Sequence, residues 1–179
     1  IDSNYNFIHH NCDQDLVDMG RLSTGNQLKI NKKVAEADFL ITTGVILPHY
    51  MAGFSGGRKS ILPGVAGRES IEANHAMMVE LISEKPELKD NPISQEMFEA
   101  AEKVGLDFIL NVVTNSSREI VEVCAGDYNE AWEAGISESA AMYQLPLAKK
   151  AEAAIVSSGG FPRDINIYQA QKALDHADH

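Results

Sequence analysis

The chain has 179 residues, a length that favours one domain, or one domain with part of a second. Hydrophobic residues make up 44% and charged residues 23%, so a core can form without disulfides or structural metals. Asp and Glu outnumber Lys and Arg by 26 to 15, and the net charge of −11 argues against nucleic acid and anionic membranes as partners.

Simple sequence patterns also predict where the protein is located and whether the sequence is a piece of a longer protein. No apolar run approaches the length that spans a bilayer, and no signal-peptide pattern opens the sequence. Cys12 and Cys124 lie far apart, which is more typical of free thiols in a reduced cytoplasmic protein than of a disulfide framework. Because the sequence starts at Ile1 and stops at His179 inside a predicted helix, we expect a piece of a longer protein, with the remainder of that protein as its main partner.

Strands and helices are predicted to alternate along the chain. Before residue 44 we expect a strand at 5–9, two extended pieces over 20–31, a short helix capped by Asn31 that runs to Ala37, and a buried strand at 39–43 that can pair in parallel. After residue 67 we expect helices at 68–83 and 93–104, strands at 106–113 and 120–124, a helix from Asp127 to about Tyr143, a strand at 153–157 and a last helix opened by Asp164. This order predicts an α/β fold with a mixed or parallel sheet and flanking helices. Pro146 marks the best boundary, which divides the chain into parts 1–145 and 146–179.

Between these blocks, residues 44–67 hold six glycines and two prolines together with many large apolar side chains. Such a loop is functional more often than disordered, and its backbone N–H groups can approach an anion. A standard phosphate-binding P-loop does not fit, because Arg58 replaces its second glycine and Pro63 blocks a following helix. No dinucleotide fingerprint is present either.

Three side chains in or near this loop can carry chemistry. His49 can act as an acid or base near neutral pH, and a desolvated Lys59 can act as a nucleophile or covalent tether. His75 sits on a predicted helix, where a lone histidine is more often a surface or packed residue than a metal ligand.

The stretch that ends at His75 resembles the signature of the nickel-pincer lactate racemase family. The family's pieces Pro-His-Tyr, Ala-Gly-x-Ser-Gly-Gly-x-Lys, Ile-x-Pro-Gly and Asn-His all occur in order, with 10 positions from His49 to Lys59 and 16 from Lys59 to His75. Residues 158–172 resemble the opening of the family's second domain. The resemblance implies that 1–145 is the later part of an N-terminal cofactor-binding and catalytic domain, and that 146–179 begins a truncated C-terminal domain.

The resemblance also implies a cofactor, nickel held by a pyridinium-thioamide-thiocarboxylate mononucleotide. Lys59 would hold this nickel-pincer nucleotide through a thioamide, and His75 would be the protein's ligand to nickel, for which imidazole is suitable. From the chemistry of the loop, we expect Ser55, Gly56 and Gly57 to approach the nucleotide phosphate.

The implied reaction is racemisation or epimerisation at C2 of a 2-hydroxy acid, lactate or similar, by hydride transfer to the cofactor. His49 resembles one of two catalytic histidines. Gln169 and Lys172 resemble groups that contact the substrate carboxylate, and their i, i+3 spacing lets one helix face present both.

Two family residues are absent from the sequence, a second catalytic histidine and a substrate-binding arginine, which the family has upstream of the part that matches Ile1. We therefore expect this chain alone to be inactive, and His9 and His10 are not convincing replacements. A non-catalytic nucleotide- or metal-binding module of the same family remains an alternative. A phosphotransferase is disfavoured, because no evident set of carboxylates for Mg²⁺ accompanies the loop.

Overall fold

The computed structural model describes residues 5–79, 81, 86–146, 148–149 and 151–178. The chain divides into two compact units, Ile1–Met142 and Tyr143–His179, and each is described here by itself. The assignment of the two parts to an N-terminal and a C-terminal domain of a longer protein stays a prediction.

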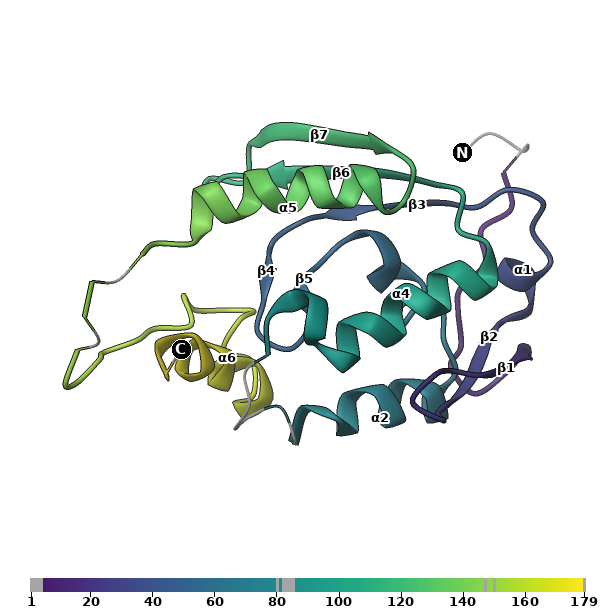
Figure 1. The fold of residues 1–179 in the computed structure, drawn as a ribbon, viewed down its shortest axis with the longest axis horizontal. Coiled ribbons are helices and arrows are strands. Elements are labelled where there is room, and N and C mark those ends of the chain that lie inside the picture. The colour runs from purple at the N-terminus through teal and green to yellow at the C-terminus, as the bar shows by residue number, and fades with distance from the viewer. Residues whose placement is uncertain (1–4, 80, 82–85, 147, 150, 179) are drawn as a thin grey trace. The chain divides into compact units, whose positions relative to one another are not determined.

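A three-stranded sheet lies in the first unit (Figure 1). Its strands, in spatial order, are β3 (Ile41–Val45), β6 (Phe108–Thr114) and β7 (Ile120–Gly126). Strands β3 and β6 run parallel, whereas β6 and β7 run antiparallel. The sheet is therefore mixed and has helices beside it, which confirms the predicted α/β class.

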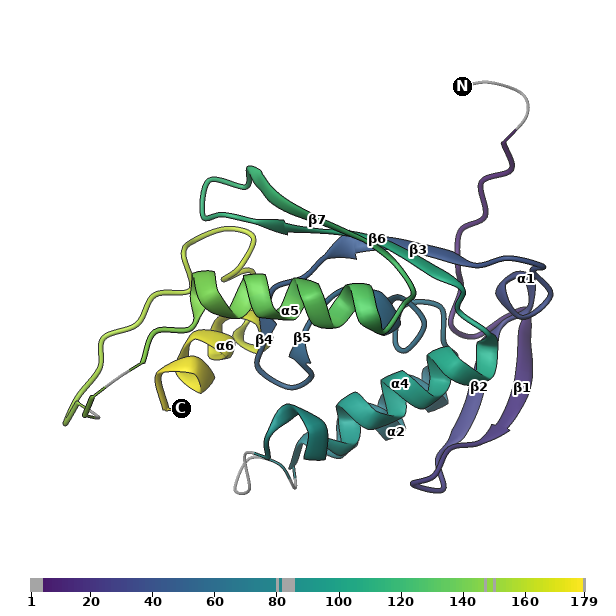
Figure 2. The same cartoon turned by 45° about the horizontal axis from the view of Figure 1, so that its top comes forward.

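Helix α5 (Glu130–Tyr143) covers one face of this sheet, as Figures 1 and 2 show. Asp127 sets its start, because the side chain accepts hydrogen bonds from the backbone N–H groups two and three residues later. At Gly135 the helix approaches the sheet so closely that an added Cβ would lie 3.0 Å from Sγ of Cys124. The helix predicted after Asp127 is thus confirmed.

The other elements of the first unit are the antiparallel pair β1 (Leu16–Arg21) and β2 (Gln27–Asn31), α1 (Lys32–Ala35), β4 (Pro48–His49), β5 (Gly53–Phe54), the 3₁₀ helix η1 (Gly57–Ser60), α2 (Arg68–Ala76), the 3₁₀ helix η2 (Leu88–Asp90) and α4 (Pro92–Val104). The side chain of Asn31 caps α1, as predicted. Asn91 caps α4 in the same way, and Gly105 ends that helix in the left-handed conformation. Buried apolar side chains from these elements, the sheet and α5 form one core.

Two predicted strands are wrong. Residues 5–9 form no strand, and Tyr5 and Phe7 are 72% and 77% exposed. Residues 153–157 also form none, with Ile155 fully exposed. Aromatic and β-branched side chains favour a strand only where a neighbouring strand pairs with it and a core covers one face.

Three other predictions need adjustment. The strand predicted at 39–43 forms two residues later as β3 and is not buried; its residues alternate between exposed and half-buried, because α5 covers only one face of the sheet. The last helix, α6 (Ile167–Asp178), begins after Asn166 rather than at Asp164, because the Asn166 side chain caps it. Helix α2 ends at Ala76, and most of its predicted extension beyond residue 79 lies outside the described residues.

Candidate cofactor-binding site

The glycine-rich segment 44–67 folds around core side chains. Strands β4 and β5 pair antiparallel, with His49 opposite Gly53, and η1 follows directly. Gly53 and Gly56 have φ values of +75° and +78°, a conformation that glycine adopts without strain. Apolar side chains anchor the segment in the core: Ile46, Met51, Phe54, Ile61 and Leu62.

This folding brings Lys59 of η1 against His49 of β4. The Nζ atom of Lys59 lies 2.8 Å from Nε2 of His49. The other ring nitrogen, Nδ1, accepts hydrogen bonds from the backbone N–H groups of Met51 and Ala52 at 3.3 and 3.2 Å. Since Nδ1 is occupied by these two backbone groups, Nε2 is the ring nitrogen that faces the Lys59 amine. In its deprotonated form the Lys59 amine can act as a nucleophile or covalent tether.

His75 lies near the end of α2, next to the fully buried Asn74. Nδ2 of Asn74 donates to Oε2 of Glu96 at 2.9 Å and to the carbonyl of Ile93 at 3.3 Å, which fastens α2 to α4. The ring of His75 donates from Nδ1 to the carbonyl of Ile71 at 2.9 Å, so its Nε2 has the lone pair. Metal-binding histidines commonly have this arrangement, because the bond to a carbonyl fixes the ring and its tautomer.

The electrostatics of His75 point the same way. Its burial lowers the pKa below the ordinary value, the hydrogen bond to Ile71 opposes this, and a positive charge on Lys59 lowers it further. The neutral ring that results is the form that ligates a metal. The structure thus brings Lys59 against His49 and places His75 near enough to Lys59 for the lysine charge to act on it. Within the described ranges, no group of three His, Cys, Asp or Glu side chains could hold a metal ion together.

Side chains of the predicted phosphate loop have structural contacts of their own. The hydroxyl of Ser55 donates to a carbonyl at the end of β3 at 2.7 Å. A Cβ added at Gly56 would lie 2.7 Å from Nδ2 of Asn111, and one at Gly57 would lie 2.9 Å from Cδ1 of Trp132. These close approaches explain why glycine is needed at both positions. Contact of this loop with a nucleotide phosphate stays a prediction.

The predicted carboxylate-binding pair lies in the second unit, on α6. Nζ of Lys172 donates to Oε1 of Gln169 at 2.9 Å and lies 5.5 Å from the ring centroid of Tyr168. Both predicted side chains are half-buried on one helix face, as the i, i+3 spacing predicts. Their contact with a substrate stays a prediction.

Sequence reasoning missed three side chains that support the loop. Arg58 is only 7% exposed, and its guanidinium carbon lies 3.4 Å from the ring centroid of Trp132. Asn111 is fully buried beside Gly56, and its amide atoms have no hydrogen-bond partner in the described part of the chain. The available signals were an asparagine inside an apolar strand and a single tryptophan in the whole sequence.

Comparison with known proteins finds relatives of this chain. Residues 1–85 match the model of the lactate racemase N-terminal domain. A lactate racemase of Thermoanaerobacterium thermosaccharolyticum is 45% identical over 161 residues, and one of Lactiplantibacillus plantarum is 41% identical over 170 residues. The chain is thus similar to lactate racemases along most of its length. The matches cover 87% and 93% of this chain, but the chain spans only 37% and 39% of those two relatives.

Known structures support the same relationship. The lactate racemase apoprotein of T. thermosaccharolyticum superimposes with a TM-score of 0.78 and 39% identity, over 94% of this chain and 41% of that one. A crystal structure of a Thermotoga maritima protein shares the fold, with a TM-score of 0.63 and 24% identity over 79% of this chain and 41% of its own. Among the described residues, no helix has the length and apolar character that crossing a membrane would require.

Proposed function

We propose that this chain is the cofactor-holding part of a 2-hydroxy-acid racemase or epimerase that depends on a nickel-pincer nucleotide. One observation carries the proposal: the Lys59 amine lies 2.8 Å from His49, with His75 close enough to respond to its charge. The names of the two lactate racemase relatives support a small 2-hydroxy acid as the substrate. Since the chain spans about two fifths of each relative, activity and substrate are part of the proposal.

The residues present fit the proposed cofactor. Lys59 would form the thioamide through its amine, which lies beside Nε2 of His49 and reacts in its deprotonated form. His75 would offer Nε2 to nickel, with its ring held by the carbonyl of Ile71. When bound, the pincer nucleotide supplies an acceptor for the hydride at C2 of the substrate.

The chain's own residues would orient the substrate and move its proton. Nδ1 of His49 accepts hydrogen bonds from two backbone N–H groups, so Nε2 is the ring nitrogen that would exchange a proton with a substrate hydroxyl. On α6, the Lys172 ammonium and the amide N–H of Gln169 would each donate a charge-assisted hydrogen bond to the substrate carboxylate. Both cysteines are free, which supports a reducing cytoplasmic location.

The test is a peptide mass map with nickel quantified on the same sample, after expression of the chain in cells that make the cofactor. We expect a sulfur-containing nucleotide adduct on Lys59 with near-stoichiometric nickel. Lys59→Arg should lose both adduct and nickel, His75→Ala should keep the adduct and lose most of the nickel, and the exposed Lys32→Arg should change neither. An unmodified Lys59 without nickel would refute the proposal and favour a non-catalytic binding module.

Turnover is a separate measurement. We expect this chain alone to be inactive, because the second histidine and the arginine implied by the family resemblance are absent from its sequence. Racemisation of lactate by the isolated chain at a rate comparable with a full-length relative would contradict that part of the proposal.

A further inference from the structure

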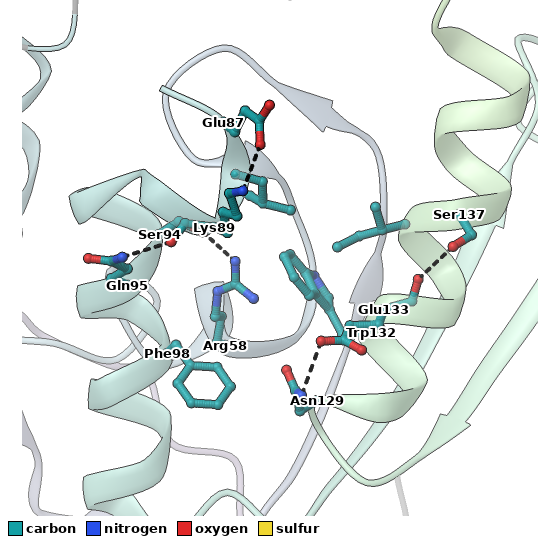
Figure 3. Close-up of a pocket in the computed structure, with 12 residues that line it drawn as sticks. Arg58, Glu87, Lys89, Ser94, Gln95, Phe98, Asn129, Trp132, Glu133 and Ser137 are labelled. Atoms are coloured by element: carbon teal, nitrogen blue, oxygen red, sulfur yellow. Dashed lines mark hydrogen bonds and ion pairs between the residues drawn. The ribbon is translucent and has the colours of Figure 1, made fainter. Parts of the chain in front are cut away.

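A cavity of about 620 Å³ opens between α4 and α5, at the side chain of Arg58 (Figure 3). It lies within the first unit, and His49, Lys59 and His75 are not among its lining residues. Its volume is in the range of small-molecule sites. Apolar side chains supply much of its wall: Leu88, Phe98, Trp132 and Ile136.

Arg58 is a buried positive charge that forms no ion pair with any described residue. Its guanidinium packs against the ring of Trp132, and its Nη2 donates to the hydroxyl of Ser94. None of the ion pairs in the described part of the chain includes Arg58. Burial lowers its pKa to about 10, and the nearby Glu133 carboxylate only partly opposes this. A buried charge left in this state costs free energy that a bound anion would offset.

The surroundings add positive potential and limit the charge of the anion. The first turns of α4 and α5 line the cavity, and helix N-termini carry partial positive charge. Glu87 and Glu133 also line it and would repel a dianion more than a monoanion. The planar guanidinium fork suits the two oxygens of a carboxylate.

We propose that this cavity binds a small organic monocarboxylate, with its carboxylate on Arg58 and an apolar body against Trp132 and Phe98. The site is distinct from the one around Lys59, so it does not depend on the proposed cofactor. It gives the chain a second place where a small acid can bind, on the same 3₁₀ helix that carries Lys59.

The probe is phenylacetate, titrated into the full chain at constant ionic strength. Trp132 is the only tryptophan, so its fluorescence reports directly on the cavity, and the thermal midpoint should rise with ligand concentration. We expect a saturable change, with binding at least about tenfold weaker for benzyl alcohol, which lacks the charge. Acetate, which lacks the apolar body, and inorganic phosphate, a dianion, should also bind more weakly than phenylacetate.

Three variants decide the assignment. Arg58→Gln should weaken binding at least about tenfold, whereas Arg68→Gln, which removes an exposed arginine paired with Asp13, should leave it unchanged. Glu133→Gln should strengthen binding of phenylacetate, because it removes a carboxylate that repels the anion. Glu133 is exposed, so this variant tests the proposal even where Arg58→Gln does not fold. No saturable change with phenylacetate, equal binding by Arg58→Gln, weaker binding by Glu133→Gln, or tighter binding of phosphate would each overturn the proposal.

Discussion

Glu96 joins three separate parts of the first unit, and we predict that its removal is costly. It is 1% exposed, and its carboxylate accepts hydrogen bonds from Thr24, from Asn26 at 2.7 Å and from Asn74 at 2.9 Å. Thr24 and Asn26 lie at the turn between β1 and β2, where water can replace the carboxylate, so their loss costs about 1 kcal/mol together. Asn74 is fully buried and keeps its bond to the carbonyl of Ile93, but leaving its other amide N–H unpaired costs about 2 kcal/mol. With a further 1 kcal/mol or so for the cavity, Glu96→Ala should lower the free energy of unfolding by about 4 kcal/mol.

The assay is urea denaturation of the full chain, followed by the fluorescence of its single tryptophan. Glu102→Ala is the matched control, because Glu102 is exposed on the same helix, and its urea midpoint should match the parent's. Glu96→Gln keeps the shape and one acceptor oxygen and should cost about half as much as Glu96→Ala. A loss below about 1 kcal/mol for Glu96→Ala would refute the reasoning that buried donors depend on this carboxylate.

Two further predictions concern the candidate site. Gly56→Ala should lower the thermal midpoint more than Gly25→Ala does. Both glycines have positive φ, but a Cβ at Gly56 would also lie 2.7 Å from Nδ2 of Asn111, whereas the space at Gly25 is open. Equal midpoints of the two variants would contradict this packing argument. Folding lowers the pKa of His75, so the folded chain favours the neutral ring. The stability that this preference contributes is fully present above about pH 6.5, the pKa of a histidine in the unfolded chain. It is lost as the pH falls toward the pKa of His75 in the folded chain. The parent's urea midpoint should therefore fall more than that of His75→Gln between pH 7.5 and pH 5, and parallel curves would disprove the lowered pKa.

Local patterns predicted those features of the fold that depend on near neighbours. Asn31 and Asp127 cap their helices because a side-chain oxygen reaches backbone N–H groups two or three residues later, whatever the rest of the chain does. Tertiary context decided the rest. The aromatic run at residues 5–9 has high strand propensity and yet forms no strand, since no described strand pairs with it.

The candidate site divides in the same way. The motif and its spacing named His49, Lys59 and His75 from the sequence alone, together with the resemblance to lactate racemases that the comparisons support. Which atoms meet was decided by the tertiary structure: Lys59 of η1 reaches His49 of β4, and the hydrogen bonds of Asn74 hold α2 against α4. The burial of Arg58 beside Trp132 depends on α5, which follows it by more than seventy residues, and no local pattern contains that contact.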